Sequence, residues 1–489
     1  MAGLALAAGA VAAAGPWDSG QRKAEREWAA ARGVAGGAHH RAPAPTRPGP
    51  VAAPAPVPAP SAPSVLAAWD AAGTAKATAP ATAPGHLAKQ LATKLAPLLA
   101  DPALGGSPAA SVVDVATGTQ LYGMRTGAPM TPASTTKIAT AVAALSALGP
   151  DHRVPTTVVS SKDGKGLTLV GGGDATLDMA ALGTLADRTA RALRDLGVTT
   201  VRLTYDASLY KGPALHPIGP NPNLAPVSAL MVGEGRLDPK STGAADRSGD
   251  PAGDAARAFD RLLGERGIDS PGAPVAGRPA AGATPVAKVL SAPLPALVER
   301  ALTSSDNDIA EALARQTALA SGEEASFAGA ERAIARQLTG LKLPLPQAKA
   351  KAGTGTGTGI GPFAPTGPLS GARFADGSGL NRTDRLSAGL LTALLARAAD
   401  PAHPELRPVL TGLPVAGFSG TLSTRYGATS PATGLVRAKT GTLSGVNTLA
   451  GTVVTPDGRL LAFAFLAGNT TSRDGAQSAL DRLAAALAS

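Results

Sequence analysis

The sequence predicts an α+β, multidomain protein in which an antiparallel sheet flanked by helices is interrupted by an α/β insertion. Two strand-like runs, 110–114 and 120–124, flank the turn residues Thr117-Gly118 and predict a hairpin. Between about 155 and 291, strand-like and helix-like patterns alternate, as in a small α/β unit. Near the C-terminus the chain has three more strand-like runs that we assign to one antiparallel sheet: 435–443, 446–454 and 460–466.

The remaining elements follow from periodicity. Leucines at 87, 91, 95 and 98–99 fall on one side of a helix, and the apolar run 138–148 fits a buried helix. Further helices are expected over 179–196, 252–266 and 474–487, and the polar cluster within 302–311 is expected to cap a helix that runs to about 320. Further strands are expected over 154–159, 167–170 and 198–205. The run 374–382 is expected to be a strand end plus a turn, and the Gly-Thr run 353–361 a surface loop.

These patterns divide the chain of 489 residues into four parts. Residues 86–154 and 292–489 are expected to form the main domain, and 155–291 the inserted subdomain. Residues 1–16 resemble part of a signal peptide or membrane anchor, whose true start we expect upstream; a chance alanine run is the alternative. Residues 17–85 are Pro/Ala-rich and predict an extended spacer that holds a domain away from a membrane, the alternative being a tail without purpose.

Composition excludes several classes of function. The net charge of +10 is modest, and no run of five Lys/Arg residues provides a nucleic-acid footprint. The chain has no cysteine, which removes disulfides, thiol catalysis and thiolate metal sites. None of the six histidines lies in a motif, and no His-Glu-x-x-His occurs, which disfavours a zinc hydrolase. The turn Gly171–Asp174 lacks the spacing of a phosphate-binding loop.

The stretch with the clearest chemistry is Ser134-Thr135-Thr136-Lys137, at the head of the 138–148 helix. Residues three apart on a helix share a face, so the lysine amine lies close to the serine hydroxyl. A neutral lysine can take the proton of a serine and make it a nucleophile. Ser134 as an ordinary helix N-cap is the alternative, since serine is common at that position.

Two more motifs follow in order, Ser305-Asp306-Asn307 before a helix and Lys439-Thr440-Gly441 on a strand. Each motif is weak alone, but the ordered set is typical of penicillin-binding proteins and class A β-lactamases. From residue 86 onward the chain resembles the D-alanyl-D-alanine carboxypeptidase/endopeptidase family, the class C penicillin-binding proteins, with an actinobacterial-like composition. Supporting matches are 171–174, 304–311, 376–380, 419–422 and 438–446.

The resemblance implies a penicillin-binding transpeptidase-like domain with an insertion between the first and second motifs. It implies a catalytic set of Ser134, Lys137, Ser305, Asn307 and Lys439, with Thr440, Gly441 and Thr442 binding substrate. It implies no metal and no cofactor. The substrates would be peptidoglycan muropeptides and the inhibitors β-lactam antibiotics, in the extracytoplasmic cell envelope, with a secreted or membrane-associated N-terminus.

The family mechanism assigns each residue a role. Ser134 would attack the penultimate D-alanine carbonyl, and Lys137 would accept its proton, with a pKa lowered by the neighbouring charge of Lys439. Ser305 would relay the proton to the leaving group, and Asn307 would hold the substrate amide.

The strand that carries the third motif would bind the rest of the substrate. Lys439, Thr440 and Thr442 would bind its terminal carboxylate, and the backbone N–H groups of Ser134 and Thr442 would form an oxyanion hole. The edge of this strand could pair with an extended peptide.

Two alternatives remain at this level. One is a serine β-lactamase or esterase of the same fold, although Glu323 and Glu324 do not match the Glu-x-x-Leu-Asn segment of class A enzymes. The other is a catalytically silent wall-binding regulator, which would have no need of all five catalytic residues.

Overall fold

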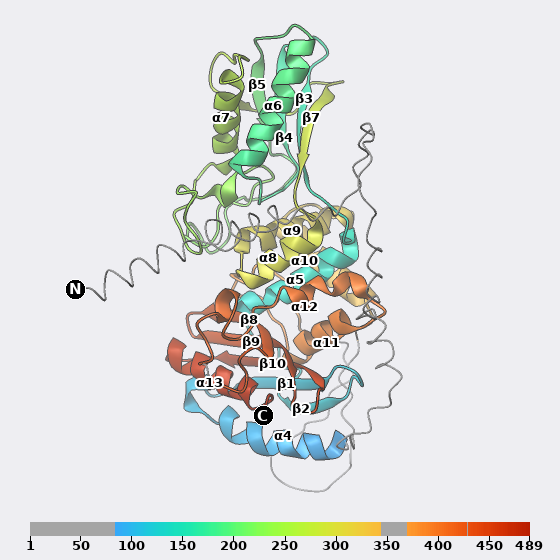
Figure 1. Cartoon of the computed structure of the whole chain (residues 1–489), viewed down its shortest axis with the longest axis vertical. Helices are drawn as coiled ribbons and strands as arrows, with labels where there is room; N and C mark the ends of the chain where they lie inside the picture. Colours follow the sequence, from blue (N-terminus) through green and yellow to red (C-terminus); the bar gives the residue numbers. More distant parts are fainter. Residues whose placement is uncertain (1–83, 344–368, 428) are drawn as a thin grey trace, which may run out of the picture. The chain divides into compact units, whose positions relative to one another are not determined.

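The three-dimensional structure is a computed structural model that describes residues 84–343, 369–427 and 429–489 (Figure 1). The expected signal or anchor at 1–16, the spacer up to residue 83 and the Gly-Thr run 353–361 lie outside the described residues. Among the helices of the described part, none combines the length and the apolar composition that a membrane crossing requires.

The main sheet is antiparallel and has the strand order β2-β1-β10-β9-β8. Its first two strands, β1 (Ala109–Asp114) and β2 (Gln120–Met124), form the expected hairpin. The last three are β8 (Val436–Leu443), β9 (Val446–Val454) and β10 (Leu460–Gly468), joined by short turns. Strand β10 pairs with β1, so the two ends of the domain sequence meet in the middle of the sheet. The prediction of one antiparallel sheet is confirmed.

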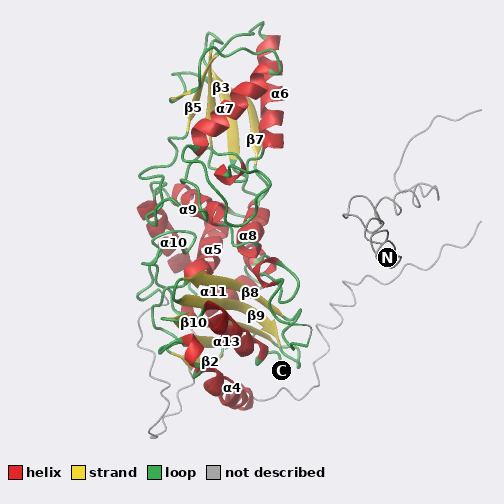
Figure 2. Cartoon of the chain, turned by 90° about the vertical axis from the view of Figure 1, so that its left-hand side faces the viewer, coloured by secondary structure: helices red, strands yellow, loops and turns green. Residues whose placement is uncertain are grey.

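Both faces of this sheet are covered because its strands alternate between two cores. Phe463 and Phe465 of β10 face the core shared with α4 (Pro84–Leu99) and α13 (Arg473–Ala485). Ala462 and Ala464 of the same strand face the core shared with α11 (Ala388–Ala399). Figure 2 shows α13 and α4 on the side of the sheet away from α5.

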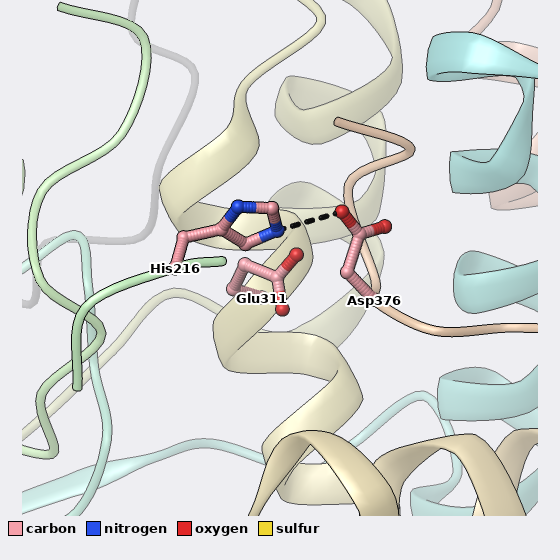
Figure 3. Close-up of side chains that lie close together, drawn as sticks. All are labelled: His216, Glu311 and Asp376. Atoms are coloured by element: carbon pink, nitrogen blue, oxygen red, sulfur yellow. Dashed lines mark hydrogen bonds and ion pairs between the residues drawn. The ribbon is translucent and has the colours of Figure 1, made fainter. Parts of the chain in front are cut away.

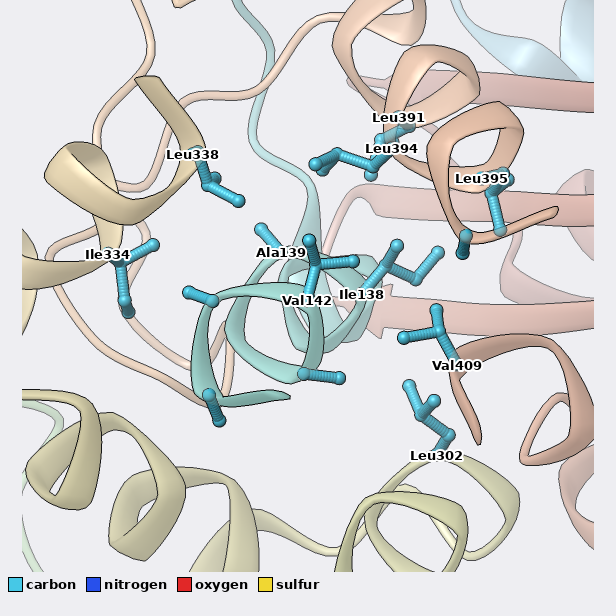
Figure 4. Packing of buried hydrophobic residues seen from close by; sticks show 14 of the residues in the cluster. Ile138, Ala139, Val142, Leu302, Ile334, Leu338, Leu391, Leu394, Leu395 and Val409 are labelled. Atoms are coloured by element: carbon cyan, nitrogen blue, oxygen red, sulfur yellow. The ribbon is translucent and has the colours of Figure 1, made fainter. Parts of the chain in front are cut away.

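Helix α5 (Thr136–Leu148) lies at the centre of the second core (Figure 4). Every residue from Thr136 to Leu145 is buried, as the small and branched residues of this run predict. Ile138, Val142 and their neighbours pack against the surrounding helices α8 (Leu294–Thr303), α9 (Asn307–Ala320), α10 (Phe327–Gly340), α11 and α12 (Pro408–Thr411). A helix so enclosed holds Lys137, in its first turn, in one place, together with the adjoining turn Ala133–Thr135 that carries Ser134.

The inserted sheet is mixed and has the order β6-β5-β4-β3-β7. Strands β4 and β5 are parallel and β3 is antiparallel to both β4 and β7. Helices α6 (Met179–Asp195) and α7 (Pro251–Gly264) share a core with it. The strands are β3 (Pro155–Ser160), β4 (Gly166–Gly171), β5 (Arg202–Asp206), β6 (Val275–Ala276) and β7 (Thr284–Leu290). The domain limits at 154/155 and 291/292 stay a prediction.

Five short 3₁₀ turns complete the described elements: η1 (Pro102–Leu104), η2 (Ala133–Thr135), η3 (Gly233–Gly235), η4 (Pro404–Leu406) and η5 (Gly420–Leu422).

Two predictions of secondary structure need correction. The strand expected over 198–205 begins only at Arg202, after Gly197 with φ +68°. The run 374–382 contains no strand, because side-chain carboxylates, described below, take its backbone N–H groups.

Strand β8 reaches the first motif through a close backbone approach. Thr448, which pairs with Gly441 of β8 from the neighbouring strand β9, donates through its Oγ1 a hydrogen bond of 2.8 Å to the carbonyl of Pro132, just before η2. A Cβ on Gly441 would lie 2.1 Å from Thr448 Oγ1 and 2.8 Å from the Pro132 oxygen. Only glycine lets β8 pack this closely against the turn that carries Ser134.

We expect Gly441→Ala to destabilise the protein by about 1–3 kcal/mol, because the added methyl group overpacks this contact. The matched control is Gly340→Ala at the end of α10, where nothing lies within 4 Å of the added Cβ. Thermal unfolding of both variants checks the prediction. Equal midpoints for the two variants would contradict it.

Candidate active site

Ser134 lies in η2, between a strained residue and a buried helix. Ala133 has φ 47°, a left-handed conformation that is costly for a residue with a Cβ. The turn is held in place because Thr135 Oγ1 donates to the Pro132 carbonyl at 2.7 Å and Gly379 packs against the Ala133 carbonyl. The Ser134 side chain caps neither η2 nor α5, so the N-cap alternative is not what the structure shows.

Lys137 is 1% exposed, and its Nζ has three oxygen partners. These are Ser134 Oγ at 3.1 Å, Asn307 Oδ1 at 2.7 Å and the carbonyl of Ser378 at 2.7 Å. Burial lowers the pKa of Lys137 to about 8, against the opposing charge of Asp376. The lowered pKa was expected from the charge of Lys439, and the structure assigns it to burial.

The second motif forms the start of α9. Asp306 is the N-cap, and its Oδ1 accepts from the N–H of Ile309 at 3.0 Å. Asn307 is the first helical residue: its Oδ1 accepts from Lys137, and its Nδ2 donates to the carbonyl of Asn223 at 2.9 Å. Ser305 has φ 57° and is half-buried. The role of Asn307 that the structure makes visible is to hold Lys137, and contact with a substrate amide stays a prediction.

The third motif lies on β8, the last strand of the sheet. Lys439 is fully buried and its Nζ donates to the Thr440 carbonyl at 2.9 Å. Burial, followed by the charge of Lys137, lowers the pKa of Lys439 well below its usual value. Thr440 Oγ1 lies 2.8 Å from Thr421 Oγ1, and Thr442 Oγ1 accepts from Gln477 Nε2 at 3.4 Å.

A cleft of about 520 Å³ brings the three motifs together. Its lining includes predicted site residues from all three: Ser134, Ser305, Asn307, Thr440 and Thr442. Lys137, Lys439 and Gly441 are absent from the lining and lie buried behind it. The hydroxyl groups of the predicted site therefore face the cleft, while both lysines lie beneath its surface.

The sequence alone did not reveal a buried network behind the cleft, in which His216, Glu311 and Asp376 come together (Figure 3). His216 Nε2 lies 2.9 Å from Asp376 Oδ2. Glu311 Oε1 accepts from the N–H groups of Gly377 and Ser378 at 3.0 and 2.9 Å. The matches at 304–311 and 376–380 included Glu311 and Asp376, but no pattern in the sequence indicated His216.

These three side chains are of metal-ligand type, but hydrogen bonds already occupy both carboxylate oxygens of Asp376 and both ring nitrogens of His216. Asp376 accepts from the N–H groups of Gly379 and Asn381 as well as from His216. His216 Nδ1 accepts from the N–H of Ile218, which places the ring proton on Nε2, toward Asp376. A metal would have to displace this proton, and we assign the group as a hydrogen-bond network.

A second group of carboxylates, Glu234, Asp306 and Asp308, lies beside the second motif. Arginines already neutralise it: Arg247 Nη1 is 2.8 Å from Asp308 Oδ2, and Arg300 contacts Glu234. Burial raises the pKa of Asp308 to about 7, although the charge of Arg247 opposes this. Because guanidinium groups supply the positive charge, this group also serves as an ion-pair network and not as a metal site.

A serine hydroxyl paired with a buried lysine, beside an exposed strand edge, defines an active site of the serine acyl-transfer class. Residues 91–246, 238–356 and 368–487 match the D-Ala-D-Ala carboxypeptidase 3 (S13) family. The chain belongs to this family of peptidases, and the resemblance noted in the sequence is confirmed.

Individual relatives agree. Carboxypeptidase DacB of Mycolicibacterium smegmatis is 36% identical over 413 residues, covering 80% of this chain and 82% of that protein. The D-alanyl-D-alanine carboxypeptidase of Actinomadura sp. is 30% identical over 433 residues, covering 74% of this chain and 78% of that one. The chain also resembles the crystal structure of penicillin binding protein 4 (dacB) from Haemophilus influenzae, with a TM-score of 0.63 at 21% sequence identity. The match covers 81% of this chain and 97% of that one, and the two proteins share the same fold.

The pKa of Lys137 predicts how acylation depends on pH. Lys137 can accept a proton only when neutral, so the acylation rate constant with benzylpenicillin should rise with pH and level off above about 8. Lys137→Met should reduce the rate by about 10²–10⁴, as expected for loss of a general base. Stopped-flow acylation between pH 6 and 9 measures both.

The matched control is Lys240→Met, which removes an exposed lysine and should keep the profile of the unaltered protein. A flat profile between pH 6 and 9, or acylation that falls as the pH rises, would rule out Lys137 as the base.

Proposed function

We propose that the chain is a serine-type D-Ala-D-Ala carboxypeptidase/endopeptidase that cuts peptidoglycan stem peptides through an acyl-enzyme on Ser134. The observation that carries the proposal is the contact of 3.1 Å between Lys137 Nζ and Ser134 Oγ, made by an amine whose pKa burial lowers to about 8. The names of the curated relatives support the substrate class.

The partners of Lys137 explain how it acts as a base. A neutral amine has two N–H groups and one lone pair. Asn307 Oδ1 and the Ser378 carbonyl, each at 2.7 Å, take the two N–H groups. The lone pair then points to the third partner, the Ser134 hydroxyl, whose proton it accepts as Oγ attacks the substrate carbonyl. The two shorter contacts thus orient the base toward its one reactive partner.

The later steps use the cleft wall. Ser305, next to the cleft, would pass the proton from Lys137 to the leaving amine. The N–H groups of Ser134 and Thr442 would stabilise the oxyanion, which is the largest expected contribution to catalysis. The hydroxyl groups of Thr440 and Thr442 would bind the terminal carboxylate. Lys439 would act from beneath, where its Nζ holds the Thr440 carbonyl.

Substrate pairing with β8 is supported by the sheet topology. Strand β8 lies at the end of the sheet, so one edge of β8 pairs with no other strand of that sheet. The segment around Val415 covers the beginning of that edge through a bridge to Arg437. Thr440, Thr442 and Leu443 line the cleft instead. An extended stem peptide could therefore add along this half of β8.

The proposal also includes the location of the protein and excludes a role as a silent regulator. Action on peptidoglycan places the protein outside the cytoplasm, and residues 1–85 would bring it there as a signal or anchor followed by a spacer. A silent wall-binding regulator is disfavoured, because burying an amine that forms no ion pair costs stability and a buried lysine with a lowered pKa beside a cleft marks a candidate functional site. No ion pair of Lys137 is found within the described residues.

The identity of the nucleophile can be tested directly. After treatment with a labelled penicillin, mass spectrometry should place the adduct on the peptide that contains Ser134, and Ser134→Ala should abolish labelling. The control is Ser304→Ala, which removes an exposed serine of the same cleft and should label normally. An adduct on any other residue would contradict the assignment of Ser134 as the nucleophile.

Slow release of penicillin separates the proposal from the β-lactamase alternative. Class A enzymes use a glutamate to activate the deacylating water, and no matching segment occurs in this sequence. Without that base we expect deacylation to be slower by about 10²–10⁴ than in such an enzyme. Stopped-flow labelling followed by a chase should show fast acylation and recovery over minutes or longer. Many turnovers per minute on benzylpenicillin would instead support a β-lactamase.

A further inference from the structure

One loop of the inserted subdomain reaches the base of the active site. Residues 214–227, here called the 214–227 loop, are closed at their ends by the N–H of Val227, which donates to the Ala214 carbonyl at 2.8 Å. Leu224 and Val227 pack against Leu380, which follows the turn 376–379. The loop therefore rests on the segment that supplies one of the partners of Lys137.

His216 is the polar contact of this loop with that turn. Its side chain is buried, its Nδ1 accepts from the N–H of Ile218 at 3.1 Å, and its Nε2 donates to Asp376 Oδ2 at 2.9 Å. The ring stands edge-on to Phe327, with centroids 5.4 Å apart. Two hydrogen bonds and one ring contact fix the imidazole in one orientation and one tautomer.

Asp376 passes this constraint on to the base. Its Oδ1 accepts from the N–H of Gly379 at 2.6 Å, and its Oδ2 accepts from Ser378 Oγ at 3.2 Å. These bonds enclose the peptide whose carbonyl, that of Ser378, accepts from Lys137 Nζ at 2.7 Å. A continuous chain of contacts therefore runs from His216 through Asp376 and Ser378 to Lys137.

We propose that His216 is a positioning residue, through which the inserted subdomain sets the orientation of the base Lys137. This inference rests on the proposed function, in which Lys137 activates Ser134. It gives the insertion a role in the chemistry, since His216 belongs to the insertion and Asp376 to the main domain.

The charge of Asp376 also links His216 to Lys137. Burial raises the pKa of Asp376, but hydrogen bonds, that of His216 first among them, outweigh burial and hold the pKa below its usual value. The Asp376 charge in turn opposes the fall in the pKa of Lys137. Without the His216 donor, Asp376 loses anionic character and the pKa of Lys137 should fall further. The other charged or titratable groups around Asp376 and Lys137 are Asp306, Asp308, Glu311, Arg315, Asp384 and Lys439.

The same loop also forms part of the cleft wall. Ile218 and Asn223 line the cleft in which the substrate is expected. The N–H of Ile218 donates to His216, and the carbonyl of Asn223 accepts from Asn307, a second partner of Lys137. A substrate that contacts this wall therefore touches residues one hydrogen bond away from the groups that orient the base.

The test compares two variants of the full chain. His216→Phe keeps a ring of similar size but removes the donor, whereas His216→Gln retains a donor in a comparable position. We expect His216→Phe to lower the acylation rate constant by about tenfold to a hundredfold through misplacement of the base, and its pH midpoint to move below that of the unaltered protein. His216→Gln should recover most of both.

The matched control is His403→Phe, which breaks a histidine–carboxylate pair of the same length, 2.9 Å to Glu405, outside the site. It should keep the rate and the midpoint. A rate and midpoint of His216→Phe equal to those of the unaltered protein would overturn the proposal. So would an equal loss in His216→Phe and His216→Gln at an unchanged midpoint, which indicates only a structural role.

A second measurement does not depend on the folding of His216→Phe. The ¹⁵N shifts of the imidazoles in the unaltered protein, with His216 assigned by its loss in His216→Gln, should place its proton on Nε2. A proton on Nδ1 would reverse the bond to Asp376 and refute the inference. Failure of the unaltered protein to acylate at Ser134 would instead refute the proposed function, so the two failures are distinguishable.

Discussion

The structure depends most on the burial of Lys137. An ammonium group removed from water is costly unless it finds charged or polar partners, and here its three contacts are uncharged oxygens. The neutral amine, which needs less solvation, is favoured by the same surroundings, so its pKa falls to about 8. Full enclosure of α5 by the neighbouring helices is therefore a requirement of the chemistry as well as of the core.

Three segments distant in sequence must meet for this burial to work: the turn before α5, the start of α9 and the turn at 376–379. Helix α9 connects two of them because Asn307 and Glu311 are four residues apart and share one face. Asn307 binds Lys137, and Glu311 binds the backbone of the turn whose Ser378 carbonyl binds Lys137 again. One rigid helix thus sets two of the three contacts of Lys137.

Local patterns predicted most of this architecture and the motifs, but they could not reveal the network behind the cleft. The apolar run of α5 and the paired strands 436–454 are signals within a short window. The contact of His216 with Asp376 joins residues 160 positions apart, and neither has a local pattern that indicates it. The strand end expected in the run 374–382 is absent for the same reason, whereas the expected turn is present: buried carboxylates of Asp376 and Glu311 take N–H groups that a sheet neighbour would otherwise use.

The backbone strain lies where these constraints are strongest. Ala133 and Ser305 both adopt positive φ, at 47° and 57°, and each adjoins or carries a hydroxyl that faces the cleft. Such conformations cost about 1–3 kcal/mol each and persist only when the surroundings over-determine them. At Ala133 the surroundings are Gly379 and the hydrogen bond from Thr448, so the sheet and the 376–379 turn hold the strained backbone together. The 214–227 loop contacts the same turn through His216 and Leu224, so residues from both sheet-containing parts of the chain surround the strained backbone before Ser134.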